Sequence, residues 1–151
     1  MGCRAFEICQ LLWSWEISEL GTSVFIAPGQ HVRNADDWLV VLNREARSVI
    51  ATRRDQLPTH VFTFEGKPVS SMSNSAWKKV RERAGLPMVR VHDLKNTFGR
   101  RLRAAGVSFE DRQDLLGHRS GRITTHYSAA ELSRWIEAAV GLRSRTDRGP
   151  S

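Results

Sequence analysis

Three amphipathic segments, each bounded by helix start or stop signals, fill residues 91–140 and constrain the fold more than any other feature. Apolar side chains recur there at helical spacing, and Gly106 and Gly117 supply stop signals. Capping boxes beginning at Ser108 and Ser128 open the second and third segments. The predicted helices span residues 91–105, 109–116 and 129–140. Their apolar positions are Leu94, Phe98, Leu102, Ala105, Leu132, Trp135, Ile136 and Ala139.

The first half of the chain alternates short strand-like stretches with turns. Pro28-Gly29 and residues 34–36 are turn signals, which predicts a small antiparallel meander. Its strands are expected over residues 15–20, 23–27 and 38–43, with a further strand over 60–64. Helices are expected over residues 3–13, 44–57 and 75–84, the second with Ala46, Val49, Ile50 and Leu57 facing inward. The predicted fold class is α+β, mostly helical with a small antiparallel sheet.

The length of 151 residues favours one domain, which we place over residues 1–141, followed by a solvated tail over 142–151. Two cysteines, Cys3 and Cys9, stand six positions apart in one predicted helix, so no local disulfide is expected. The sequence lacks the cysteine and histidine spacing of a structural zinc site. The apolar run over 38–42 is too short to span a membrane, and the polar side chains of Glu7 and Gln10 argue against a signal peptide.

The net charge of +7 and the isoelectric point near 10.4 favour a polyanionic partner. Residues 1–71 carry 7 basic and 8 acidic side chains, whereas residues 72–151 carry 16 and 8. Arginine supplies 19 of the 23 basic side chains, and its guanidinium group can bind a phosphate through two N–H groups. Nucleic acid is therefore the favoured partner, and the run Arg100, Arg101 and Arg103 is a candidate for phosphate contacts. Arg119 and Arg122 are further candidates for DNA binding.

Candidate chemistry is concentrated between residues 91 and 128. His92 and Lys95 are three residues apart on one predicted helix, so they are expected to share a face. His118 follows a helix stop, and Tyr127, the single tyrosine of the chain, stands just before a capped helix whose N-terminus favours an anion. A phenol near imidazoles and cations can attack phosphorus while the cations hold the developing charge. Each of these side chains, taken alone, could equally have an ordinary structural role instead of a catalytic one.

These motifs resemble the catalytic domain of the tyrosine recombinases, the phage integrase family. The similarity covers nearly all of residues 2–140 and is most specific in three segments in the same order as in the family. These segments are His92-Asp93-Leu94-Lys95-Asn96-Thr97-Phe98, Ala105-Gly106-Val107, and Leu115-Leu116-Gly117-His118 through Thr124-Thr125-His126-Tyr127.

The resemblance implies site-specific DNA recombination or integration through a covalent 3′-phosphotyrosyl intermediate. Tyr127 would be the nucleophile, Arg4 would grip the scissile phosphate, and His92 would be the acid/base histidine. His118 would hold a non-bridging phosphate oxygen, and Arg33 would stand at the position of the general acid in a β-hairpin. The resemblance also implies double-stranded DNA as partner, a homo-tetramer on two DNA sites, a cytoplasmic location at the bacterial nucleoid, and neither a cofactor nor a metal.

Three positions depart from the family pattern. Lys95 stands at the position of the family's second arginine. The positive charge is kept, but the bidentate contact that a guanidinium makes with a phosphate is lost. Arg33 stands where a lysine is usual, and a guanidinium with a pKa above about 12 is a poor proton donor. Asn96 stands where many relatives carry a histidine. The chain also begins almost at Arg4, so we expect an N-terminally truncated catalytic domain with apolar surface exposed around Phe6, Ile8 and Leu12.

Two alternatives remain open at this point. The departures at positions 33 and 95 favour a catalytically impaired remnant that only binds DNA. Residues 91–117 also have the form of a helix-turn-helix regulator, which leaves the spacing from His118 to Tyr127 unexplained. The last helix is expected to expose Trp135 and Ile136 along one stripe, which makes it a candidate for docking on a neighbouring subunit, although it could equally pack within its own chain.

Overall fold

The computed structural model describes residues 2–19, 22–31, 37–117 and 128–141. Within these residues a three-stranded antiparallel sheet runs in the order β1-β2-β3. The strands are β1 (Glu16–Glu19), β2 (Thr22–Ala27) and β3 (Trp38–Val41). Ile17 pairs with Val24, and Phe25 pairs with Val40 on the other side of β2. The predicted meander is therefore confirmed, and Pro28 follows β2 just before the short 3-10 helix η2 (Gly29–His31).

Each face of this sheet is covered by its own hydrophobic cluster, because neighbouring residues of a strand point to opposite faces. Val24 lies in one cluster and Phe25 in the other. The cluster that we call the helical core consists of Val24, Leu39, Val41, Phe98, Leu102, Leu115, Trp135, Ile136 and Ala139. The cluster that we call the α2 core consists of Leu11, Phe25, Val40, Leu42, Ile50 and Val61.

The helices begin at capping residues that the sequence supplies. They are α1 (Ala5–Cys9), α2 (Arg44–Ala51), α3 (Asn74–Arg83), α4 (Val91–Ala104), α5 (Phe109–Leu115) and α6 (Ala129–Val140). The side chains of Asn43, Ser73, Ser108 and Ser128 each accept a backbone N–H at the start of α2, α3, α5 and α6. The chain also forms η1 (Trp13–Trp15) and a hairpin of β4 (Thr63–Phe64) and β5 (Lys67–Pro68). The α+β, mostly helical class is thus confirmed.

Two of the helices expected in the first half are shorter than predicted. Helix α1 ends at Cys9, and Leu12 instead forms an isolated bridge with His60, outside any regular strand. Helix α2 ends at Ala51 rather than at residue 57, and Asp55 adopts a left-handed backbone with φ of 67° that a helix does not tolerate. The prediction that Val49 faces inward is wrong, since its side chain is exposed, whereas Ile50 is buried.

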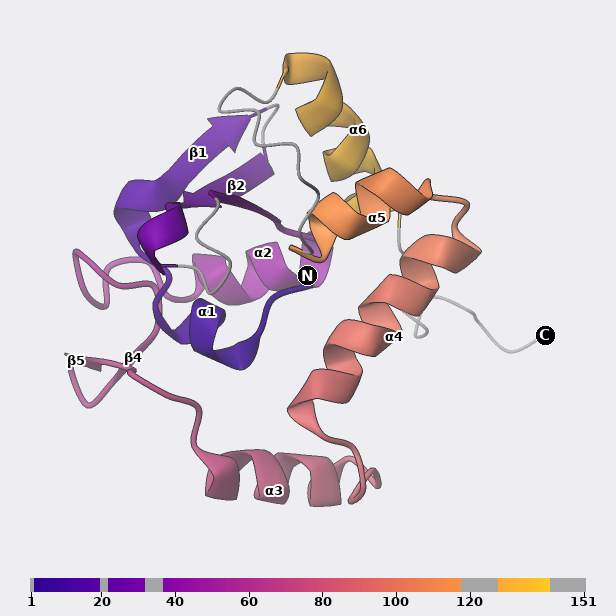
Figure 1. Cartoon of the computed structure of the whole chain (residues 1–151). Helices are drawn as coiled ribbons and strands as arrows, with labels where there is room; N and C mark the ends of the chain where they lie inside the picture. The colour runs from indigo at the N-terminus through magenta and orange to yellow at the C-terminus, as the bar shows by residue number, and fades with distance from the viewer. Residues whose placement is uncertain (1, 20–21, 32–36, 118–127, 142–151) are drawn as a thin grey trace.

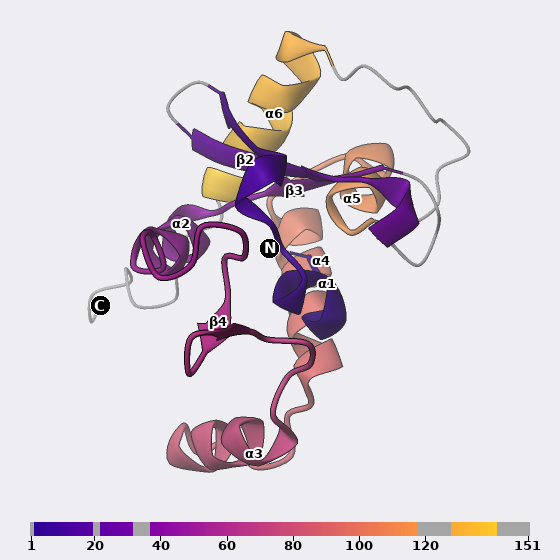
Figure 2. The same ribbon diagram turned by 90° about the vertical axis from the view of Figure 1, so that its left-hand side faces the viewer.

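Helix α4 buries a narrower stripe than its sequence predicts. Phe98 and Leu102 are buried in the helical core, but Leu94 and Ala105 are exposed. Figures 1 and 2 show that α4 reaches away from the sheet toward α3, so its N-terminal half meets the rest of the fold only on the side that carries the buried Lys95. Leu94 belongs to the half that projects, and Ala105 lies just beyond the last turn.

Helix α6 packs against its own chain, which settles the alternative left open for its apolar stripe. Trp135, Ile136 and Ala139 are all buried in the helical core. The expectation that Trp135 and Ile136 lie exposed along the helix is therefore wrong, because the sheet face formed by Val24, Leu39 and Val41 covers them. No helix in the described part of the chain has the length and apolar character needed to cross a bilayer.

Candidate active site

The N-terminal segment, α4 and the end of α5 meet at one junction. Lys95 of α4 is almost fully buried, with 6% of its surface exposed, and its Nζ donates a hydrogen bond of 2.5 Å to the carbonyl oxygen of Leu116. Leu116 caps α5, and Gly117 follows it with a left-handed φ of 60°. The left-handed turn ends the helix next to Lys95. His118, one of the predicted phosphate ligands, is the next residue in sequence.

The N-terminal segment approaches α5 closely because residue 2 is glycine. A Cβ atom on Gly2 would lie 2.7 Å from the carbonyl oxygen of Leu115 and 3.0 Å from Cδ2 of Leu116. On α4, a Cβ on Gly99 would meet Cδ1 of Leu116 at 3.2 Å. The Leu116 side chain therefore packs between Gly2 and Gly99. Because neither glycine has a side chain, the N-terminal segment and α4 come close to the end of α5, and Arg4 and Lys95 lie near each other.

This packing gives a testable difference between the two glycines. We expect Gly2→Ala to lower the free energy of unfolding by about 1–3 kcal/mol, because its new methyl group meets a backbone oxygen that cannot rotate away. Gly99→Ala is the matched control, since it meets only the end of a leucine side chain and gains about 1 kcal/mol of helix propensity. Urea denaturation of both variants measures the difference, and equal losses would contradict the close approach at Gly2.

Arg4 is held by a buried carboxylate on the first turn of α1. Its backbone N–H donates to Oε2 of Glu7 at 2.7 Å, and its Nη1 donates to Oε1 at 3.0 Å. The Glu7 side chain is 6% exposed and that of Arg4 34% exposed, so the pair has a buried acidic side and a solvent-facing basic side. The family resemblance singled out Arg4, but the sequence assigned Glu7 no role in the site. The structure makes Glu7 the residue that orients Arg4.

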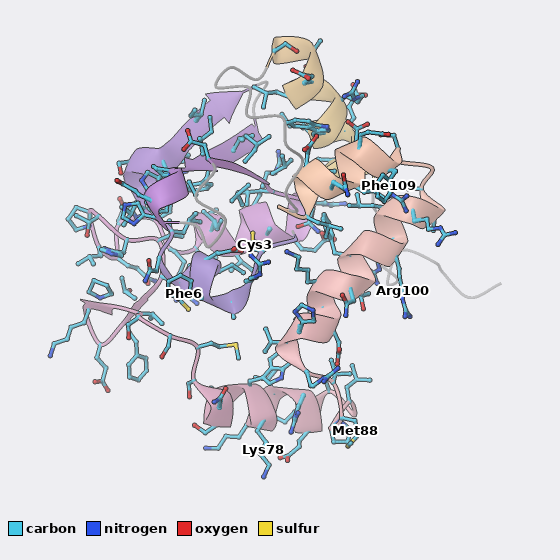
Figure 3. All side chains as sticks on the ribbon, in the orientation of Figure 1. Cys3, Phe6, Lys78, Met88, Arg100 and Phe109 are labelled. Carbon is cyan, nitrogen blue, oxygen red and sulfur yellow. The ribbon has the colours of Figure 1, made fainter. Side chains whose placement is uncertain are left out.

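The electrostatics of the junction favour an anion. Burial lowers the pKa of Lys95, and the positive charge of Arg4 lowers it further, while Glu7 acts in the opposite direction. Two cations thus share the site with a single carboxylate. Burial raises the pKa of the Cys3 thiol, which is labelled in Figure 3, to about 12. The thiol therefore stays neutral at physiological pH and is not a reactive nucleophile.

The predicted site residues fall into four groups. Arg4 and Lys95 lie at the junction. His92 is exposed on the first turn of α4, one turn before the buried Lys95. Arg100, Arg101 and Arg103 are exposed on the later turns of α4, and Figure 3 shows Arg100 pointing away from α1. The other predicted site residues lie outside the described part of the chain: Tyr127, His118, Arg33, Arg119 and Arg122.

Comparison with protein-family models gives a match to the phage integrase family over residues 1–134. The chain belongs to the phage integrase family. At the level of the family this means a recombinase-type enzyme that acts in DNA integration and recombination. Neither a curated protein nor a solved structure matches the chain.

In this integrase-family chain, α3 carries basic residues that sequence reasoning left unassigned. Lys78, Lys79 and Arg83 are exposed on it, and Figure 3 shows Lys78 pointing into solvent. Helix α3 is joined to the chain ahead of α4 by two hydrogen bonds to the carbonyl oxygen of Val89, at 3.2 Å from Trp77 Nε1 and at 3.3 Å from Arg81 Nη1. The signal was the surplus of basic residues after residue 71, which did not single out α3.

Metal ligation has no support in the described part of this integrase-family chain. Among residues 2–19, 22–31, 37–117 and 128–141, no group of three His, Cys, Asp or Glu side chains could hold a metal ion. The carboxylates that lie near basic groups are instead engaged by them, as Glu7 is by Arg4 and Asp93 by Arg90. The chemistry that this junction can support is the binding of an anion by fixed cations.

Proposed function

We propose that this chain cuts and rejoins DNA through a covalent 3′-phosphotyrosyl intermediate formed by Tyr127. The observation that carries the proposal is the junction of Arg4 and Lys95, two cations fixed beside the end of α5. Family membership supplies DNA as the substrate class. A pair of preorganised cations suits a phosphate whose charge increases in the transition state.

In the proposed reaction the phenol oxygen of Tyr127 bonds to phosphorus as the bond from phosphorus to the 5′ oxygen breaks. The phenol proton passes to His92, the acid/base candidate, and Arg33 is the candidate that protonates the leaving 5′ oxygen. Arg4, Lys95 and His118 hold the non-bridging oxygens. Rejoining is the reverse, in which a 5′-hydroxyl attacks the phosphotyrosyl bond, so no external energy source is required.

The wider DNA contacts are proposed for five arginines. Arg100, Arg101 and Arg103 line the outer turns of α4, and Arg119 and Arg122 follow α5 in sequence. Side chains of this kind bind phosphates without selecting a base sequence. We further propose that residues 1–141 act as one catalytic domain and that active assemblies are tetramers on two DNA sites.

One observation favours a second candidate, a remnant that binds DNA without cutting it. The Lys95 ammonium group already donates to the Leu116 carbonyl oxygen and is almost fully buried. A lysine in this position reaches a phosphate with fewer N–H groups than the arginine that it replaces. The two candidates differ in whether a covalent bond to DNA forms.

The test is covalent trapping on a suicide substrate nicked beside the scissile phosphate, prepared as a fragment library from the source genome. We expect an adduct that survives detergent and whose phosphorylated peptide, identified by mass spectrometry, contains Tyr127. DNA affinity should fall steeply between 50 and 200 mM salt, because bound arginines release counterions. Salt-sensitive binding without an adduct would favour the remnant, and the absence of both would contradict either function.

A further inference from the structure

The proposed reaction needs a proton donor for the leaving 5′ oxygen, because the departing alkoxide is strongly basic. A guanidinium, with a pKa above about 12, is a poor donor, and this applies to Arg4 and Arg33 alike. The Cys3 thiol is no better, since burial raises its pKa to about 12. The two carboxylate oxygens of Glu7 already accept hydrogen bonds from Arg4. Among the described ionisable side chains of the junction, this leaves Lys95.

The surroundings of Lys95 favour the release of its proton. Lys95 is 6% exposed, and the loss of hydration lowers its pKa. The positive charge of Arg4 lowers this pKa further, and the opposite effects of Glu7 and Cys3 do not cancel the shift. From α5 the contact is an uncharged group, the carbonyl of Leu116. A donor whose pKa lies closer to the working pH is a more effective acid catalyst.

The hydrogen bond to Leu116 can hold the donor atom in place in either protonation state. Nζ of Lys95 donates to the carbonyl oxygen of Leu116 at 2.5 Å. An ammonium group has three N–H donors, so two have no partner among the described residues. After the loss of one proton, the amine still has an N–H group for the carbonyl oxygen and gains a lone pair that can accept a proton. The same atom can therefore give a proton during cleavage and take one during rejoining.

We propose that Lys95 is the catalytic acid that protonates the leaving 5′ oxygen, a role that the family resemblance gives to Arg33. As the bond from phosphorus to the 5′ oxygen breaks, its electron pair stays on that oxygen and takes a proton from Nζ, which leaves a 5′-hydroxyl and a neutral amine. In rejoining, the amine takes the proton back from the attacking 5′-hydroxyl. Arg33 then serves as a fixed cation, which suits a guanidinium. The assignment rests on the proposed function and changes the proton donor in it.

A sulfur atom in place of the leaving 5′ oxygen separates proton donation from charge stabilisation. A thiol has a pKa of about 8.5, so a sulfur leaving group departs as an anion and needs no donor. Two nicked substrates are built on the cleavage site that covalent trapping identifies, one with oxygen and one with sulfur at the 5′ position of the scissile phosphate. The rate of adduct formation at saturating protein is measured on both.

Lys95→Arg keeps the positive charge and removes the proton donor. We expect this variant to be at least tenfold slower than the wild type with the oxygen substrate, since general acid catalysis contributes about 10²–10⁴ in rate. With the sulfur substrate it should be at least as fast as the wild type. Lys95→Met, which needs no room for a guanidinium, is the second variant. Its deficit should shrink at least tenfold with sulfur, and the remainder reports the lost charge.

Two further variants remove a cation without removing the proposed donor. Arg4→Gln is the matched control, since Arg4 belongs to the same junction, and its deficit should be equal on the two substrates. Arg33→Met tests the competing donor and should behave in the same way as Arg4→Gln.

The pH dependence of the rate gives a second readout. With the oxygen substrate, the wild-type rate should fall as the pH rises through the pKa of Lys95, which is lower than that of an ordinary lysine. The fall should be smaller with sulfur, and Lys95→Arg should lack it.

The outcomes separate this proposal from the proposed function. A wild-type adduct, with a rate that sulfur restores only in the two Lys95 variants, supports both. Lys95 is not the acid if Lys95→Arg matches the wild type with oxygen, if both Lys95 variants are equally slow on the two substrates, or if sulfur restores Arg33→Met instead. The proposed function stands in those cases. If the wild type forms no adduct on either substrate, the proposed function fails and the role of Lys95 fails with it.

Discussion

Tyr127→Phe is expected to abolish covalent capture of DNA completely while leaving DNA binding within about twofold of the wild type. The substitution removes a single oxygen atom, the one that would form the bond to phosphorus. Tyr127 is the single tyrosine of the chain, so no second phenol can replace it. The phosphate contacts proposed for Arg4 and Lys95 do not depend on that oxygen, so binding should persist.

Two measurements on the same nicked substrate check this expectation. A denaturing gel reports the covalent adduct, and a gel-shift titration at fixed salt reports the dissociation constant. An adduct that persists in Tyr127→Phe would show that another nucleophile forms the bond and would contradict the proposed mechanism. Loss of binding together with loss of the adduct would show that residue 127 acts in DNA recognition instead.

Lys95→Met is expected to lower the rate of adduct formation by about 10²–10³ without lowering the stability of the fold. One preorganised contact to a developing phosphate charge typically contributes a factor of this size. Stability should hold because Lys95 is buried, and burial is the main cause that lowers its pKa. The buried charge no longer has to be desolvated, and this gain offsets the loss of the hydrogen bond to the Leu116 carbonyl oxygen.

The pH dependence of stability gives an independent check with a definite sign. Because the pKa of Lys95 is lowered in the folded state, the unfolded chain holds more protons between that pKa and the ordinary value of lysine. The wild type should therefore gain stability relative to Lys95→Met as the pH rises from 7 toward 10. Thermal melting of both proteins at several pH values measures this difference, and a difference that is constant with pH would contradict the buried state of Lys95.

Lys95→Arg completes the comparison, since it restores the guanidinium that the family pattern has at this position. With the sulfur substrate, which needs no proton donor, two parallel N–H donors should raise the rate of adduct formation above that of the wild type if a phosphate occupies the junction. A rate equal to that of Lys95→Met would instead show that the space between α4 and Leu116 fits only the slimmer lysine.

The local signals in the sequence predicted much of the fold, and the places where they failed have a physical cause. The turn at Pro28-Gly29 and the apolar stretches around it predicted the meander, and Ser108 and Ser128 predicted the starts of α5 and α6. Helix α2 ends at Ala51, and the left-handed backbone at Asp55 rules out its continuation to residue 57, which apolar periodicity does not report. The exposure of Leu94 likewise depends on how far α4 projects from the sheet.

The candidate site was predictable in its residue types but not in its contacts. Arg4 and Lys95 were chosen from motifs, and the structure places them in one junction. The burial of Lys95 was not predictable, because its partner is a backbone carbonyl oxygen that any residue at position 116 would supply. The role of Glu7 was missed for a similar reason, since an i,i+3 pair at a helix start is usually a solvated ion pair.

The arrangement of the two hydrophobic clusters has a consequence for how the protein loses activity when it is heated. Cys3, next to Arg4, packs against the α2 core, whereas Leu116, which receives Lys95, packs against the helical core. The segment that carries Arg4 and the end of α5 that contacts Lys95 therefore pack against clusters on opposite faces of the three-stranded sheet. We expect local loosening on either face to separate these two segments before the whole chain unfolds, so thermal inactivation should precede melting and should respond to destabilising substitutions on both faces of the sheet.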